Sequence, residues 1–415
     1  MRYEPLNLGR WVIWGAMALV FLVAPLVFSG GFALTMLIQM GTMIIFALSY
    51  NMLLGQGGML SFGHAVYFGL GGFIAAHALN LAGRGVLWIP VPLLPLVGGL
   101  GGLVFAIVYG SFSTRRAGTV FAMISLGVGE MMAASSLIFD KFFGGEEGIT
   151  ANRTKAPLLL GLSFSSDRQV YYLIAFWVLA CALLMYAFSR TPVGRMANAV
   201  RDNPERAEFV GYSAPWVRFV SFCAAGFFAG VAGGLFAINY EIFTAANMGL
   251  AASGAVLLMT YIGGIGYFVG PVLGAVIFTF LQSMLSDYTG IWLLYLGLLF
   301  LATVLFVPMG LAGVLMMHAP AWRARRLAHL VVPYTLVAVA AILAAVGVIG
   351  LLEMIHFLVT APAAATTKRL FWTVVAVRTV PPWLAFAAML SAGALALRWA
   401  GPRTAAALAE ANRPA

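Results

Sequence analysis

Twelve long apolar stretches run through the chain, and they constrain its fold more than any other feature of the sequence. They lie near residues 11–28, 33–53, 59–80, 88–112, 118–139, 170–188, 217–239, 251–264, 267–286, 290–308, 331–352 and 380–398. A membrane-spanning helix needs about 20 mostly apolar residues to cross the hydrocarbon core. Only 9% of the 415 residues are charged, whereas soluble domains carry about 25%. The sequence therefore predicts an all-α, polytopic integral membrane protein and excludes a water-soluble enzyme.

Two of the twelve stretches differ from a simple span. Residues 11–28 follow Arg2 and Arg10, as a signal peptide would, but their length and their tryptophans favour an uncleaved first span. Residues 251–264 are short and end in two glycines, which predicts a broken or re-entrant segment. We therefore expect about ten core spans in a first domain, residues 1–320, and two additional spans in a C-terminal extension, residues 321–415.

The distribution of basic residues predicts the orientation. With the N-terminus inside the cell, 15 of the 23 lysines and arginines fall in cytoplasmic loops, as the positive-inside rule requires. The formal net charge of +10 is then explained by orientation, and nucleic acid is not expected as a partner. The basic tract from Lys368 to Arg378 falls on the outer side and fits this arrangement least well.

The sequence lacks motifs for catalysis. It contains neither a GxxxxGK[ST] phosphate loop nor a GxSxG nucleophile elbow. Its five histidines do not pair at metal-ligand spacing. We therefore expect no cofactor, no metal site and no enzymatic activity in this chain.

Two glycine-rich stretches carry polar residues within the apolar sequence. The first runs from Gly55 to Gly72 and includes Gln56, Ser61 and His64, with Asn51 one turn upstream. Such a stretch fits either close helix packing or a break that lines a polar pathway. The second begins at Gly263 and Gly264. Paired interrupted segments in the two halves of a transporter point to a substrate route.

Glu130 is the only acidic residue inside an expected span, and it lies near the middle of that span. A charge there costs at least about 2–3 kcal/mol, so the carboxyl group should face protein or water, or be protonated. Gly127 and Ala134 give it a small-residue face. It is either a neutral carboxyl group between helices or part of a pathway. The candidate pathway residues are Asn51, Gln56, Ser61, His64, Ser125, Glu130, Gly263 and Gly264.

The longest hydrophilic inside loop, residues 189–218, contains the pattern of a short capped helix. Asn203 fits the N-cap, Pro204 the first helical position, Glu205 the first turn and Gly211 the stop. The enclosed turn presents apolar residues among charges, in the order Glu205, Arg206, Ala207, Glu208, Phe209, Val210. This helix would either plug a groove on a partner or lie on the headgroups as a solvated connector.

Six motifs resemble those of the permease subunits of branched-chain amino acid ABC importers, the LivM-type family. They are GQGGMLSFGHAVYFGLGGF from Gly55, FAMISLGVGE at 121–130, GGEEGI at 144–149, SRTPVGRMANAVRDNPERAEFVGY at 189–212, GGIGYFVGPVLGA at 263–275 and VPMGLAG at 307–313. The motifs occur in the family's order and cover about residues 33–315.

The resemblance implies an all-helical half of an importer in the bacterial cytoplasmic membrane. Its partners would be a second permease subunit, two cytoplasmic ABC ATPase subunits and a periplasmic solute-binding protein. Residues 203–211 would form the coupling helix that docks on an ATPase. The chain has Gly71-Gly72-Phe73 where the family has Gly-Ala-Tyr. The resemblance therefore does not decide whether the substrate is a branched-chain amino acid, urea or a short amide.

Two other classes of function compete with this interpretation. A secondary carrier or channel would work without an ATPase, and it would usually carry several intramembrane acids, whereas this chain has only Glu130. A membrane enzyme for lipid-linked substrates would need a cluster of His, Asp and Glu at an interface, and the sequence has none.

Overall fold

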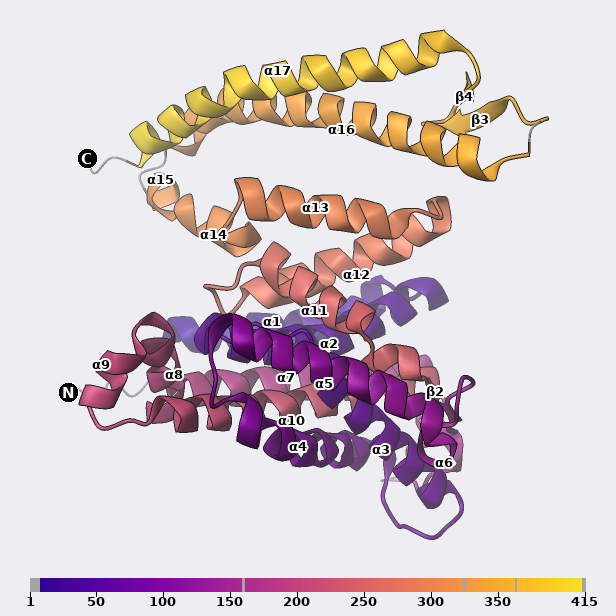
Figure 1. Cartoon of the computed structure of the whole chain (residues 1–415), viewed down its shortest axis with the longest axis vertical. Helices are drawn as coiled ribbons and strands as arrows, with labels where there is room; N and C mark the ends of the chain where they lie inside the picture. The colour runs from indigo at the N-terminus through magenta and orange to yellow at the C-terminus, as the bar shows by residue number, and fades with distance from the viewer. Residues whose placement is uncertain (1–7, 159–160, 324–325, 363, 413–415) are drawn as a thin grey trace. The chain divides into compact units, whose positions relative to one another are not determined.

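A computed structural model describes residues 8–158, 161–323, 326–362 and 364–412. The chain divides into two compact units, Met1–Gly313 and Val314–Ala415, which we describe separately. The long helices of the first unit are α1 (Leu8–Val27), α2 (Gly31–Asn51), α3 (Ala65–Gly83), α4 (Leu94–Ser113), α5 (Gly118–Ile138), α7 (Asp167–Arg190), α10 (Ala214–Tyr240), α11 (Leu250–Gly263), α12 (Gly270–Tyr288) and α13 (Trp292–Phe306) (Figure 1).

Shorter elements connect these helices. They are the π-helical turn η1 (Met52–Gln56), the 3-10 turns η2 (Val91–Leu93), η3 (Arg153–Lys155) and η4 (Ala245–Met248), and the helices α6 (Asp140–Phe143), α8 (Pro192–Asp202) and α9 (Pro204–Phe209). Strands β1 (Ile149–Thr150) and β2 (Ile242–Phe243) form one small antiparallel pair. Helix α14 (Gly310–Met317) contains the boundary between the units.

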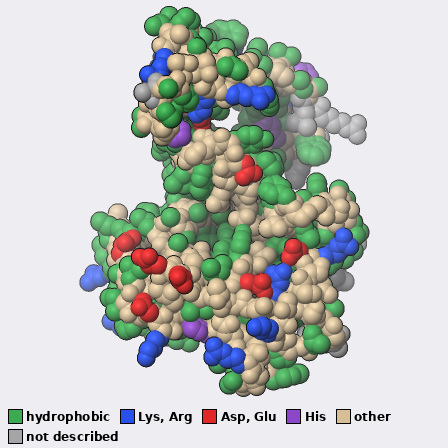
Figure 2. Space-filling view, turned by 90° about the vertical axis from the view of Figure 1, so that its right-hand side faces the viewer, with side chains coloured by type: hydrophobic (Ala, Val, Ile, Leu, Met, Phe, Trp, Pro, Cys, Tyr) green, Lys and Arg blue, Asp and Glu red, His purple; other side chains and the backbone are tan. Residues whose placement is uncertain are grey.

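The predicted all-α membrane fold is confirmed. Among the described residues, nine helices are long and apolar enough to cross a membrane, or up to ten if the bent pair Trp292–Phe306 and Gly310–Trp322 forms one span. Two expected spans correspond to shorter apolar helices, Trp14–Val27 and Leu250–Gly263. Figure 2 shows apolar side chains over much of the visible surface, as expected for helices that face lipid.

One expected span is wrong at its start. The stretch from residue 59 was expected to be helical, but α3 begins only at Ala65. The residues before it leave the helix because Gly58 has a φ of +63°, a left-handed conformation that glycine adopts without steric cost.

Glycines bring α3, α4 and α10 into close contact at the centre of the first unit. Helices α4 and α10 lie side by side in Figure 1. A Cβ atom built on Gly230 would overlap the Gly98 carbonyl oxygen, and one on Gly71 would lie 2.5 Å from the Gly230 Cα. Lipid tails are as apolar as leucine, so membrane helices associate largely through such close packing.

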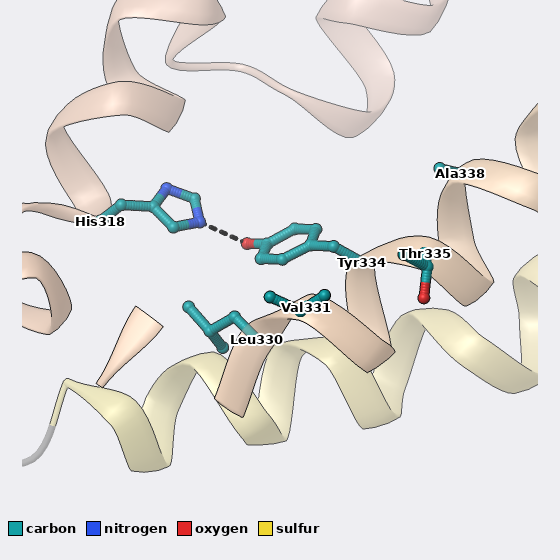
Figure 3. A pocket seen from close by; sticks show the side chains of 6 residues that line it. All are labelled: His318, Leu330, Val331, Tyr334, Thr335 and Ala338. Carbon is teal, nitrogen blue, oxygen red and sulfur yellow. Dashed lines mark hydrogen bonds between the residues drawn. The ribbon is translucent and has the colours of Figure 1, made fainter. Parts of the chain in front are cut away.

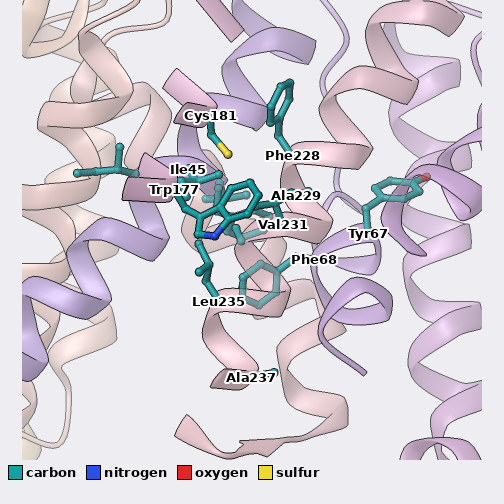
Figure 4. Packing of buried hydrophobic residues seen from close by; sticks show 14 of the residues in the cluster. Ile45, Tyr67, Phe68, Trp177, Cys181, Phe228, Ala229, Val231, Leu235 and Ala237 are labelled. Atoms are coloured by element: carbon teal, nitrogen blue, oxygen red, sulfur yellow. The ribbon is translucent and has the colours of Figure 1, made fainter. Parts of the chain in front are cut away.

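Buried apolar side chains from several helices pack around α10 (Figure 4). Trp177 and Cys181 of α7 and Phe228 of α10 are buried in one apolar cluster. The indole Nε1 of Trp177 donates a hydrogen bond of 3.2 Å to the Pro92 carbonyl oxygen, which satisfies its polar group. Cys181 and Cys223 are free thiols.

The second unit is a pair of long antiparallel helices joined by a β-hairpin. Its elements are α15 (Ala319–Arg323), η5 (Leu327–Leu330), α16 (Val331–Thr360), β3 (Thr367–Leu370), β4 (Thr373–Ala376) and α17 (Val380–Ala411). The hairpin is paired from Thr367↔Ala376 to Leu370↔Thr373. Lys368 Nζ lies 2.6 Å from Glu353 Oε2, and this ion pair holds the hairpin on α16.

A polar contact fixes the beginning of α16 within this unit (Figure 3). His318 Nδ1 lies 2.6 Å from the Val314 carbonyl oxygen, and His318 Nε2 lies 2.6 Å from the Tyr334 hydroxyl. A carbonyl oxygen only accepts hydrogen bonds, so Nδ1 carries the proton and Nε2 accepts from Tyr334. Leu330 and Val331 line the adjacent groove.

The glycine contact yields a prediction about stability. Gly230→Ala forces a methyl group into the Gly98 carbonyl and should destabilise the protein by about 1–3 kcal/mol. Gly254→Ala is the matched control, because a Cβ there meets nothing within 4 Å; it should be neutral or stabilising by up to about 1 kcal/mol. Thermal unfolding in detergent measures both variants. Equal melting temperatures would show that the close approach does not limit stability.

Candidate functional site

A non-helical segment, Met59–His64, interrupts the helices between α2 and α3. The chain leaves η1 through Gly57 and Gly58, whose amides donate hydrogen bonds of 3.1 Å back to the Leu53 and Leu54 carbonyl oxygens. Ser61 and His64 are fully buried. Met59 and Gly63 are buried as well, whereas Leu60 and Phe62 are partly exposed. Non-helical backbone at membrane depth is tolerated where protein buries it or where it lines a water-filled cavity.

Hydrogen bonds attach the segment to α2. The Tyr50 hydroxyl donates to the Ser61 carbonyl oxygen at 2.9 Å. His64 Nε2 lies 3.0 Å from Ser49 Oγ, and Ser49 itself donates to the Phe46 carbonyl oxygen at 2.7 Å. Because the Ser49 hydroxyl proton is used there, Ser49 accepts from His64 Nε2–H, which leaves His64 Nδ1 as an acceptor.

Two further serines attach the segment to α5 and the start of α3 to α11. Ser125 Oγ of α5 accepts a hydrogen bond of 3.0 Å from the Phe62 amide. Ser253 Oγ of α11 accepts one of 3.1 Å from the amide of Ala65, the first residue of α3. These two backbone amides thus find partners that lipid could not supply.

Several polar atoms around this break lack a hydrogen-bond partner in the described part of the chain. They are Asn51 Oδ1, Gln56 Oε1, Ser61 Oγ and His64 Nδ1. Buried polar groups are normally satisfied by protein or ordered water. This buried cluster therefore departs from the usual pattern, because none of its four atoms has a protein partner among the described residues.

The second glycine-rich break lies against the first. Helix α11 ends at Gly263, and Gly264 follows with a φ of +112°. A Cβ on Gly263 would overlap the Gly270 carbonyl oxygen at the start of α12. A Cβ on Gly55 would lie 2.6 Å from the Ile265 carbonyl oxygen, so the two breaks meet backbone to backbone.

Glu130 lies apart from this buried cluster. Its side chain is on the exposed face of α5, together with Met123, Gly127 and Ala134. Ser125 is on the opposite, buried face of the same helix. The candidate pathway residues therefore separate into a buried group around the two breaks and one exposed carboxyl group on α5.

The loop between α7 and α10 folds as the capping pattern predicts. Asn203 Oδ1 accepts a hydrogen bond of 3.0 Å from the Arg206 amide, and Pro204 occupies the first turn of α9. Gly211 has a φ of +90°, which suits a helix stop. The apolar contacts that hold α8, α9 and the start of α10 together involve Ala197, Val200, Ala207, Ala214 and Val217.

The two residues at the end of α9 face solvent. Phe209 is 90% exposed and Val210 is 71% exposed, while Ala207 on the opposite side is buried. A capped helix on a compact support thus presents an apolar tip away from its own protein.

One contact between this loop and the first break was missed by sequence reasoning. Arg201 at the end of α8 donates a hydrogen bond from Nη1 to the Gly55 carbonyl oxygen, across 146 positions of sequence. Its side chain also lies against Gly58. The sequence carries no periodicity or spacing that would pair these residues.

Comparisons with known proteins identify the family of this chain. The sequence profile of the family described as "Branched-chain amino acid transport system / permease component" matches residues 32–309. The chain is 27% identical over 291 residues to the high-affinity branched-chain amino acid transport system permease protein LivM of Salmonella typhimurium, which covers 65% of this chain and 67% of that protein. No solved structure gives a significant match.

Two other relatives show the breadth of the similarity. LivM of Escherichia coli is 26% identical over 291 residues, 65% of this chain and 67% of that protein. The autoinducer 2 import system permease protein LsrC of Shigella flexneri is 30% identical over 146 residues, 34% of this chain and 40% of that protein. The family profile covers well over half of the chain, so this multi-pass membrane protein belongs to the family of branched-chain amino acid transport system permease components.

Proposed function

We propose that the chain is the transmembrane permease subunit of an ATP-driven importer for branched-chain amino acids or related small polar solutes. It forms half of the translocation pathway in the bacterial cytoplasmic membrane. A second permease subunit, two cytoplasmic ABC ATPases and a periplasmic solute-binding protein complete the importer, and ATP is hydrolysed on the ATPases. Family membership supports the permease role, and relatives named as permeases of amino acid transport support the substrate class.

The proposal assigns different roles to two parts of the chain. Residues 1–320 act as the permease domain, and residues 321–415 form an extension with two additional membrane helices. The family profile ends at residue 309, and the first compact unit ends at Gly313. Both observations support a permease domain that precedes α16 and α17.

The exposed tip of α9 is the observation that carries the coupling role. Residues 203–211 are the coupling helix, which docks in a groove of an ATPase. Water-exposed phenylalanine and valine side chains gain about 1.5–3 kcal/mol each when a partner buries them. Phe209 and Val210 are exposed on a loop rich in charge, so an apolar groove with a polar rim fits them. Closure of the ATPases would then rock the permeases between two states.

Removing the apolar tip tests this docking. The double variant Phe209→Ala/Val210→Ala should lose the ATPases during gentle purification, because about 3 kcal/mol or more of interface burial disappears. Phe209→Leu/Val210→Ile is the matched control and should retain them. Mass spectrometry of the purified complexes and solute-stimulated ATP turnover provide the measurements. Wild-type turnover in the double alanine variant would contradict the coupling role.

The helix cap provides a second test on the same loop. Asn203→Ala removes the acceptor for the Arg206 amide and should destabilise α9 by about 1 kcal/mol. Asn203→Asp keeps an acceptor at that position and should behave like the native residue. Hydrogen–deuterium exchange of residues 204–210 should be faster in the alanine variant alone. If residues 204–210 exchange at the same rate in both variants, the Asn203 cap does not stabilise α9.

Glu130 lines the translocation pathway in this proposal. An acidic side chain near the middle of a span costs at least about 2–3 kcal/mol if it faces lipid. Glu130 nevertheless lies on the exposed face of α5 beside small residues. A second permease subunit or a water-filled pathway on this face would remove that cost, so the exposed face of α5 is assigned to the pathway.

Substitution of Glu130 tests whether its side chain faces the translocation pathway or lipid. Glu130→Leu should lower solute uptake about tenfold or more, because a polar contact of about 1.5–3 kcal/mol is lost from the pathway. Its neighbour Met131 is also exposed, and Met131→Leu is the control that should keep uptake. Radiolabelled uptake and thermal stability are measured together. If Glu130→Leu raises stability and leaves uptake intact, the residue faces lipid.

A further inference from the structure

We propose that Arg201 is a positioning residue that transmits movement of the coupling helix α9 to the non-helical segment Met59–His64. This inference rests on the proposed function, because it assumes that α9 docks on an ATPase. It goes further in naming the contact through which docking reaches the membrane helices.

Arg201 joins the two regions directly. It is the penultimate residue of α8 and lies two positions before Asn203, the cap of α9. Its Nη1 donates to the Gly55 carbonyl oxygen in the π-helical turn that ends α2. Carbonyl groups at a helix C-terminus lack helical partners, and a cation there also interacts favourably with the helix dipole. Arg201 therefore caps the last turn before the break.

The Arg201 side chain also packs on the turn that starts the break. A Cβ on Gly58 would lie 2.6 Å from Arg201 Cγ, so only a glycine fits beneath the aliphatic part of the side chain. Arg201 Nε lies 3.0 Å from Asp202 Oδ1, which orients the guanidinium group. The contact is thus fixed by a hydrogen bond, a packing surface and an ion pair.

On the loop side, α9 packs against α8, the helix that carries Arg201. Ala197 and Val200 of α8, Ala207 of α9 and Ala214 and Val217 of α10 are buried against one another. Val200 immediately precedes Arg201. Close-packed side chains transmit displacement rather than absorb it, so a shift of α9 reaches the guanidinium group.

On the membrane side, the break leads to the helix that carries Glu130. Phe62 in the non-helical segment donates its amide hydrogen bond to Ser125 of α5. Glu130 lies five positions further along the same helix. The π-helical turn and the partnerless polar atoms around it make this segment a candidate for a second arrangement, since π-bulges occur frequently at functional sites.

The first experiment uses the chain alone and does not depend on the ATPases. Hydrogen–deuterium exchange is compared between Arg201→Gln and Arg195→Gln in nanodiscs. Arg195 is also an exposed arginine of α8, and its side chain has no hydrogen bond or ion pair among the described residues. Exchange of the Gly57–Met59 amides should rise about tenfold in Arg201→Gln only. Equal protection in the two variants would overturn the proposed contact.

The second experiment uses the assembled importer. Arg201→Gln should keep the ATPases bound and keep basal ATP turnover, but lower the solute-stimulated component and uptake about fivefold or more. Arg195→Gln should retain the solute-stimulated ATP turnover and the uptake of the wild type. Arg201→Lys should show intermediate values of both, because lysine keeps the charge but lacks the planar guanidinium group. A purely structural role would lower the melting temperature and all activities together.

The outcomes separate this inference from the proposed function. If wild-type chain binds no ATPase, the proposed function fails, while the exchange experiment still decides the Arg201 contact. If the importer assembles and Arg201→Gln matches Arg195→Gln in stimulated turnover, the proposed function stands and the inference is wrong. Loss of the ATPases from Arg201→Gln alone would also overturn it, because Arg201 would then act in docking.

Discussion

The need to satisfy every backbone polar group in a medium without water determines most of this structure. Helices meet that need within themselves, and the segment Met59–His64 meets it only through surrounding side chains. Ser125 and Ser253 accept the amides that the break exposes, and Tyr50 donates to a carbonyl oxygen within it. The same hydrogen bonds that permit the break connect it to α2, α5 and α11, so a change at the break reaches several helices.

Close backbone contact is the second element of the architecture, and both units use it. Gly98 and Gly230 bring α4 and α10 together in the first unit, and Gly347 and Gly393 bring α16 and α17 together in the second. Membrane helices lack a hydrophobic driving force for association, so van der Waals packing at small residues takes its place. Glycine permits this packing because a Cβ atom at these positions would overlap the neighbouring helix.

The candidate functional features lie in different environments because they meet different partners. The tip of α9 is apolar and exposed to water, as suits a protein groove. Glu130 is acidic and exposed on a membrane helix, as suits a pathway or a second subunit. Arg201 is hydrogen-bonded to Gly55 just before the break, and it belongs to α8, whose apolar residues Ala197 and Val200 pack with Ala207 of α9.

The sequence alone determined the all-α membrane fold, because helix formation and lipid exposure depend on local runs of apolar residues. It also determined the cap of α9, since Asn203, Pro204 and Gly211 act over a few positions. Only the tertiary structure decided that Ser61 and His64 are buried, that Glu130 is exposed and that Arg201 reaches Gly55. Those features depend on which helix faces meet across distant parts of the chain, and local composition carries no information about that packing.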